Sequence, residues 1–279
     1  MPYPYTAGNT VGCPQGWQGS CPNARYVQAE MFYMSLWSNR SHTLSDAFFV
    51  PDFDYESAAR VAIGQRFDCS DGWEISYVGP FKWTSFAQVN AASLDPLFVP
   101  SGVNVSAFTD AVYHAQSYES KLNSFELLRK YWAWDVISQS FGIRYLNIEE
   151  AYRIFATNGL GETGQFGIDT RNHILGLQYG IDMLYPYGPR WVFATKGKLG
   201  AYGNVAEGQT QLVNAGAIQF DNESDKGQLA FLGEFGMYAT YRILPRVTAR
   251  AGYEFLYLYG VSMASEQDMT VLTRYTGRN

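Results

Sequence analysis

The chain has 279 residues and a formal net charge of −6, with 20 Lys and Arg against 26 Asp and Glu. This charge, with no basic stripe along the chain, argues against a nucleic-acid partner, whose phosphates need cations. No segment approaches the roughly 18 apolar residues of a membrane-spanning helix. No linker or low-complexity block divides the chain, so we expect an extended N-terminal segment, 1–23, followed by one domain, 24–279.

Nine strand-like segments follow one another in chain order, and apolar and polar residues alternate along most of them. They cover 24–37, 57–68, 72–89, 117–131, 134–153, 170–185, 190–205, 226–242 and 246–262. The connectors between them alternate between tight turns and long polar stretches at 38–56, 90–116, 154–169 and 206–225. One end of the predicted sheet therefore carries turns and the other carries loops, which is typical of a transmembrane β-barrel.

The two faces of these segments differ in a way that indicates how the barrel is oriented. One face of 173–185 is apolar, whereas the other is small or polar at Gly176, Gln178 and Gly180. The segments 229–242 and 247–258 repeat this arrangement. Glycine weakens an ordinary strand but suits the inside of a narrow barrel, where large side chains from every strand would collide. We therefore expect the polar face inside and the apolar face in lipid.

The number of strands follows from the architecture of single-chain bacterial barrels, which have an even number of strands. Nine segments need a partner, and 267–276 is the expected tenth strand. The sequence thus predicts an all-β, antiparallel, up-and-down transmembrane β-barrel of about ten strands, with eight to twelve admissible. Its short turns would be periplasmic and its long loops extracellular.

Aromatic residues gather near both ends of the predicted strands. Trp132, Trp134 and Trp191 lie near the tight turns, and Trp37 and Trp83 lie near the opposite ends. Two belts of aromatic rings are expected at the two interfaces of a membrane. The alternative is that these rings belong to the core of a soluble β protein.

Four stretches of the chain resemble one family in the same order. The stretch 141–150 is similar to a G-x-R-Y-L-D-L-x-E pattern, and 170–180 is similar to T-x-N-x-x-x-G-x-Q-x-G. The stretch 190–203 resembles an R-W-x-F-x-x-x-x-K strand, and 247–258 resembles a strand ending in G-Y-x-F-L-Y. These patterns belong to the beta-barrel porin-7 family of outer-membrane proteins, and the similarity runs over about 58–260. The resemblance implies an outer-membrane, porin-like barrel and carries no catalytic signature.

The charged and polar residues assigned to the inner face are of both signs. They are Arg60, Arg66, Glu74, Lys82, Arg144, Gln178, Asp182, Lys196, Lys198, Glu234, Arg242, Arg250 and Glu254. Mixed charges can pair across a narrow lumen and fill it, or they can line a narrow polar path. Both interpretations stay open at this point.

Other candidate sites are few. Cys13 and Cys21 lie close together in the N-terminal segment, and an oxidising periplasm would permit a bridge between them, with free thiols as the alternative. Asp52, Asp54 and Glu56 form a weak Ca²⁺ candidate, for which a solvated loop face is the more economical interpretation. No cofactor, metal site or catalytic residue is expected otherwise; the glycines of 159–164 match G-x-G-x-x-G but open no predicted helix.

Two functions from different classes follow. The first is passive diffusion of small hydrophilic solutes or ions through a narrow polar lumen. The second is a plugged scaffold barrel whose loops or N-terminal segment bind other components of the cell envelope; the apolar stretch 90–116 would then fold inward as a plug or outward as a contact surface. Expected partners are outer-membrane lipid and an envelope protein or a second copy of the chain. The expected location is the outer membrane of a Gram-negative-type bacterium, with an export signal outside this numbering.

Overall fold

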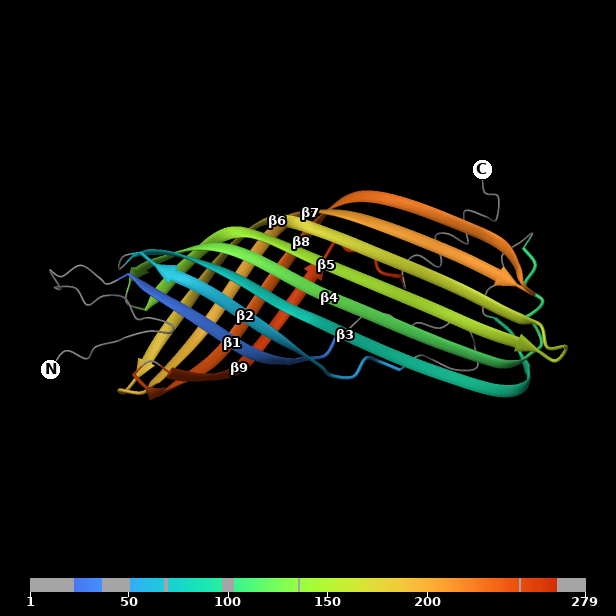
Figure 1. Cartoon of the computed structure of the whole chain (residues 1–279), viewed down its shortest axis with the longest axis horizontal. Helices are drawn as coiled ribbons and strands as arrows, with labels where there is room; N and C mark the ends of the chain where they lie inside the picture. The colour runs from blue at the N-terminus through green and yellow to red at the C-terminus, as the bar shows by residue number, and fades with distance from the viewer. Residues whose placement is uncertain are drawn as a thin grey trace.

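The computed structural model describes residues 23–36, 51–67, 70–96, 103–134, 136–245 and 247–264, and these residues form a single antiparallel sheet (Figure 1). Its nine strands are β1 (Ala24–Met34), β2 (Glu56–Arg66), β3 (Asp71–Leu94), β4 (Ala111–Trp134), β5 (Ile137–Asn158), β6 (Thr163–Tyr187), β7 (Trp191–Asn214), β8 (Ala217–Leu244) and β9 (Val247–Tyr259). Each strand pairs with the next one along the chain, so the topology is a simple up-and-down meander. Within the described part of the chain, no helix is long and apolar enough to cross a membrane.

The sheet curls until its two edge strands approach each other (Figure 1). An ion pair joins them, since the Arg250 Nε of β9 lies 3.1 Å from a Glu30 carboxylate oxygen of β1. No backbone pairing between β1 and β9 occurs among the described residues, so closure into a barrel is not seen there. The expected tenth strand, 267–276, lies outside the described residues, as does the expected N-terminal segment except Asn23. We call the concave side of the sheet the inner face and the convex side the outer face.

The strands between the edges are much longer than the sequence predicts. The predicted loops 154–169 and 206–225 are wrong, because strands β5 to β8 continue through them and meet in tight turns at 159–162 and 215–216. Residues here still alternate, with buried Phe166 and Leu212 facing inward and polar side chains facing outward. The polar composition of these two stretches predicted loops, but a strand with one face in contact with water has an equally polar composition. We call the end of the sheet that holds these two turns the far end. The opposite end, where the sequence predicts the shortest connectors, is the turn end.

A bulge in β3 changes which of its residues face inward. Val78 pairs with Ser124 of β4, but Phe81 pairs with Leu122, so β3 holds one residue more than its partner between these two pairs. Because side chains alternate with a period of two, one extra residue sends every later side chain to the opposite face. The prediction that Lys82 faces inward is therefore wrong: it lies on the outer face, with 56% of its side chain exposed.

An apolar core lies on the inner face toward the far end. Trp83, Ile168 and Leu146 are fully buried there, among other apolar side chains of β3 to β8. Trp83 was expected in an outer aromatic belt, as was Trp132, and the structure places both on the inner face. The bulge in β3 explains Trp83, because the residues after it exchange faces. Trp191, another of the rings expected in an outer belt, does lie exposed on the outer face at the turn end, and Tyr185 and Tyr187 are exposed beside it.

Candidate functional site

The inner face between the turn end and the apolar core gathers most of the charged residues singled out in the sequence. Side chains that alternate onto this face are Arg60, Arg66, Glu74, Arg144, Gln178, Asp182, Lys196, Lys198, Glu234, Arg242, Arg250 and Glu254. Arg242 lies near the end of β8 and is half-buried. The remaining side chains lie in one region, so we treat this region as the candidate functional site.

Glu234 of β8 lies at the centre of a chain of buried ion pairs. It contacts the ammonium group of Lys196, and one of its oxygens lies 2.8 Å from the Arg144 Nη1 of β5. The same Arg144 nitrogen lies 3.3 Å from Glu126 of β4, which in turn binds the Lys198 ammonium at 2.5 Å. The contacts therefore join strands that are not neighbours in the sheet.

The chain of ion pairs continues to the edges of the sheet. Lys196 Nζ lies 2.7 Å from Glu254 of β9, and Arg60 of β2 lies 3.0 Å from the same carboxylate. Arg60 also contacts Glu30 of β1 at 3.3 Å, and Glu30 pairs with Arg250. We call this set the crossing network: Glu30, Arg60, Glu126, Arg144, Lys196, Lys198, Glu234, Arg250 and Glu254.

The crossing network is consistent with the cost of burying charge. Arg144, Glu126 and Glu234 expose 2% of their side chains or less, and an unpaired charge at that depth would be strongly destabilising. Each of these groups has an opposite charge within ion-pair distance, and Gln178 and Tyr202 add hydrogen bonds around Glu126. Glu30 and Glu126 were missed in the sequence, although counting by twos along β4 from Lys130 would have found Glu126.

Two glycines on the inner face leave the space that long side chains occupy. A Cβ atom built at Gly180 would lie 2.9 Å from the Lys198 Cγ and 2.6 Å from the Ser140 hydroxyl. A Cβ atom at Gly200 would overlap the ring of Tyr202. These glycines therefore allow Lys198 and Tyr202 to lie across the interior, as expected of a narrow, curled sheet.

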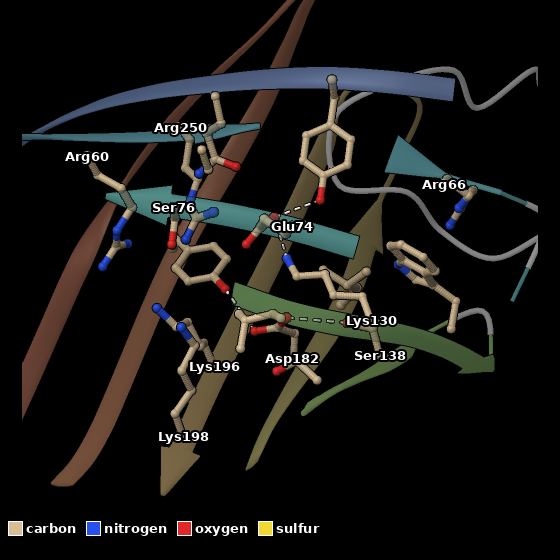
Figure 2. A pocket seen from close by; sticks show the side chains of 18 of the residues that line it. Arg60, Arg66, Glu74, Ser76, Lys130, Ser138, Asp182, Lys196, Lys198 and Arg250 are labelled. Atoms are coloured by element: carbon tan, nitrogen blue, oxygen red, sulfur yellow. Dashed lines mark hydrogen bonds and ion pairs between the residues drawn. The ribbon is translucent and has the colours of Figure 1, made fainter. Parts of the chain in front are cut away.

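A cavity of about 80 Å³ lies between the crossing network and the turn end (Figure 2). Glu74 stands in its wall, where it accepts hydrogen bonds of 2.7 Å from both the Tyr26 hydroxyl and the Lys130 ammonium group. Asp182 lies across from it and accepts hydrogen bonds from the Ser138 hydroxyl at 3.3 Å and the Tyr238 hydroxyl at 3.4 Å. The turn half of the interior is thus polar and partly hollow.

Beyond the crossing network, the chain after β9 turns into the interior. Gly260, at a φ of 78°, redirects the backbone. Asn172 then pairs with the backbone of Ser262 through two hydrogen bonds of 2.8 and 2.9 Å. Asn204 and Gln228 both donate to the Gly260 carbonyl. We call residues 260–264 the inner segment.

The inner segment is held at its last residue as well. The Ala264 amide donates to a Glu150 carboxylate oxygen at 2.8 Å, and Ala264 is fully buried. Glu150 also accepts a hydrogen bond from the Tyr118 hydroxyl at 2.8 Å. Side chains of several strands therefore fix a stretch of backbone across the interior.

The far end is covered by part of the apolar stretch 90–116. Phe108 is buried in the apolar core, and the Ala107 amide donates to the Asn214 side chain at 2.9 Å. Asn158 donates to the Ser106 carbonyl at 3.3 Å. Of the two interpretations left open for this stretch, inward folding is the one adopted by 103–110, which we call the cap.

The outer face divides sharply into an apolar and a polar part. One row of directly paired residues carries only charges: Lys121, Glu149, Arg171, Glu207 and Asp225 on β4 to β8. We call it the charged row. Toward the turn end, the described outer-face side chains of β5 to β9 include no Asp, Glu, Lys or Arg. Leu177, Leu199 and Phe231 are each at least half exposed there. We call this part of the outer face the apolar band.

The polar part of the outer face is stabilised by ordinary surface ion pairs. Glu119, beyond the charged row, lies 2.8 Å from the Lys121 ammonium and 3.0 Å from that of Lys82. The hydrogen bond from Lys121 lowers the pKa of the Glu119 carboxyl below its usual value, and the same bond raises the pKa of Lys121. This is the behaviour of charges on a hydrated surface.

The remaining sequence candidates contribute no site in the described part of the chain. Cys13 and Cys21 lie outside it. No group of three or more His, Cys, Asp or Glu side chains is placed to hold a metal ion among the residues described, so the Ca²⁺ candidate Asp52, Asp54 and Glu56 is not supported. The glycines of 159–164 lie at the tight turn between β5 and β6.

Comparisons with family models, with curated proteins and with solved structures found no match. The family resemblance drawn from the sequence therefore stays a prediction, and the function has to be argued from the two faces of the sheet.

Proposed function

We propose that the protein is a β-barrel of the outer membrane whose interior is sealed, and that it serves as a scaffold holding a rigid β-walled extension outside the bilayer. Lipid is then its first partner, through the apolar band. The main support for a sealed interior is the crossing network, because its ion pairs extend across the interior from β4 to the edge strands.

The membrane location is supported by the apolar band. A contiguous apolar surface this exposed is unfavourable in water and marks a contact with lipid or with another protein. Leu199 is 73% and Leu229 is 70% exposed, and they lie on neighbouring strands. A tilted membrane strand needs about 9–11 residues, and the outer face of β6 is free of charge from His173 to Tyr187. The charged row would mark the edge of the hydrocarbon layer.

The extension is supported by the length of the strands. Strands β5 to β8 hold 22 to 28 residues each. At about 3.3 Å per residue they run roughly 70 to 90 Å, well over what a bilayer requires. Beyond the charged row the outer face is polar and the inner face is apolar, which is the arrangement of a protein wall in water.

The sealed interior has three supports along its length. The crossing network fills the middle, the inner segment lies across β5 to β8, and the cap covers the far end. A diffusion channel needs a continuous water-filled path, whereas the interior of a barrel with few strands is nearly filled by its own side chains. Opening this interior would require breaking buried ion pairs and backbone hydrogen bonds together.

The test combines membrane insertion with conductance. Purified protein is reconstituted in lipid vesicles, its insertion is established by flotation after alkaline extraction, and the same preparation is recorded in planar bilayers. We expect the protein to float with the vesicles and to conduct no current. Protein that is released by alkaline extraction would overturn the membrane location, whereas discrete conductance steps from inserted protein would overturn the sealed interior.

A narrow diffusion pore is the second candidate, and the cavity at the turn end is the observation that favours it. The variants Lys196→Ala and Glu234→Ala separate the two candidates, because both residues lie in the crossing network. Steps in the unmodified protein whose ion selectivity changes in these variants would support the pore. Steps that appear only in the variants would support the seal.

A further inference from the structure

We propose that the cavity at the turn end binds a small oxyanion, of the phosphate or carboxylate class, in its positively charged interior. Figure 2 shows Lys130, Arg66 and Lys198 among the side chains around the cavity, on different sides of it. The inference rests on the cavity and its wall alone, and it holds whether or not the sheet spans a membrane or conducts ions.

The wall of the cavity contains many more cations than carboxylates. Its inward-facing basic side chains are Arg60, Arg66, Lys130, Lys196, Lys198 and Arg250, whereas Glu74 and Asp182 are the acidic ones among the described residues that line it. The acidic partners of the deeper cations belong to the crossing network and do not line the cavity. Each such ion pair therefore presents its positive end to the cavity and its negative end to the protein.

This orientation gives the cavity a positive potential. Charges that line a concave site with walls of low dielectric constant act on its contents far more strongly than charges on an open surface. Hydroxyl groups are present too, since Ser76, Ser138 and Ser140 are part of the wall. Charge-assisted hydrogen bonds from ammonium and guanidinium groups, with hydroxyl donors beside them, are what oxyanions require.

The size of the cavity restricts the ligand. A volume of about 80 Å³ corresponds to roughly five water-sized positions. Phosphate and small carboxylates have about that many non-hydrogen atoms. The cavity reaches the turn end, because its wall includes Ala24 at the start of β1 and Arg66 at the end of β2.

The test titrates the full chain, purified in an uncharged detergent, with inorganic phosphate in a calorimeter. We expect one saturable site, competition by acetate, and no comparable heat with a cation such as Ca²⁺. The variants Arg66→Gln and Lys130→Gln are expected to weaken phosphate binding by about tenfold or more. Glutamine at position 130 keeps an N–H donor for Glu74, so the folded sheet should remain intact in Lys130→Gln even if Arg66→Gln, which loses a stacking contact with Trp132, does not fold.

The matched control is Arg129→Gln, which removes the same charge at the same end of the sheet. Arg129 lies on the outer face, paired with Asp71 at 2.6 Å, and is not part of the cavity wall. Its affinity for phosphate should equal that of the unmodified protein. Absence of saturable binding, or an equal loss in Arg129→Gln and Lys130→Gln, would overturn the proposal.

A lipid headgroup carries the same phosphate chemistry as the free ion. The titration is therefore repeated in nanodiscs of zwitterionic lipid and of anionic lipid. Equal affinities in both would support a soluble anion, because anionic headgroups then do not compete for the site. Weaker binding of free phosphate in anionic nanodiscs alone would support the oxyanion site and assign its ligand to the membrane.

Discussion

The two halves of the molecule, on either side of the charged row, have opposite polarity. In the turn half the outer face is apolar at Leu177 and Leu199, while the inner face holds Arg144 and Glu234. In the far half the outer face carries Asp221 and other charges, while the inner face holds the apolar core. The same strands run through both halves without interruption. The difference shows that the same alternation of apolar and polar residues suits both halves of a strand. Only the face that carries the apolar residues changes from one half to the other.

The largest expected effect comes from the inner face of the turn half. Replacing Arg144 with Met leaves Glu126 and Glu234 short of a buried cation, so we expect a loss of about 3–5 kcal/mol in the free energy of unfolding. The measurement is urea unfolding in one detergent. The control is Lys121→Met, on the outer face, which should cost about 0–1 kcal/mol. Equal losses would contradict the contrast between a buried and a hydrated network.

A charge placed in the apolar band tests the outer faces against each other. Leu177→Arg puts a cation where the proposal places hydrocarbon, and we expect a loss of about 2–4 kcal/mol, measured by unfolding from lipid vesicles. Gln165→Arg is the matched control, on the outer face of the same strand in the far half. It should change stability by no more than about 0.5 kcal/mol. If both variants were equally stable, the apolar band would not face lipid.

The strand pattern made much of the fold predictable. Arg144, Lys198 and Glu234 were assigned correctly to one face, because a strand alternates its side chains with a period of two. The same rule failed for Lys82, because Gly79 and Pro80 lie in a bulge that shifts the register. A Gly-Pro pair inside a predicted strand is a signal for a bulge, and the strand assignment did not use it. A single inserted residue reverses every assignment after it.

The interior was predictable only in part. Polar residues of 206–225 were interpreted as a loop, although they form the outer face of strands in the far half. The contact between Asn172 and Ser262 joins residues 90 positions apart, and no local pattern signals that a side chain will bind distant backbone. The sequence thus showed which residues of the inner face are charged, whereas the contacts between side chains that fill the interior depend on how the sheet curls.

The smallest expected effect lies on the outer face of the far half. Glu119 has a lowered pKa because Lys121 donates a hydrogen bond to its carboxylate. A carboxyl group whose pKa is lower in the folded state stabilises the fold above its unfolded pKa, and this contribution disappears as the pH falls through the folded pKa. Glu119→Gln should therefore cost at most about 1 kcal/mol at neutral pH and nothing in acid, as measured by urea unfolding at both pH values.

Two further measurements isolate the pair from the rest of the surface. In a Lys121→Met background, Glu119→Gln should cost less than it does in the unmodified chain, because one of its two cations is already absent. Raising the salt concentration should reduce the cost as well, since exposed charges are screened. A cost that is independent of both salt and pH would mean that Glu119 is not in water. The boundary between the two halves would then lie farther from the turn end than the charged row.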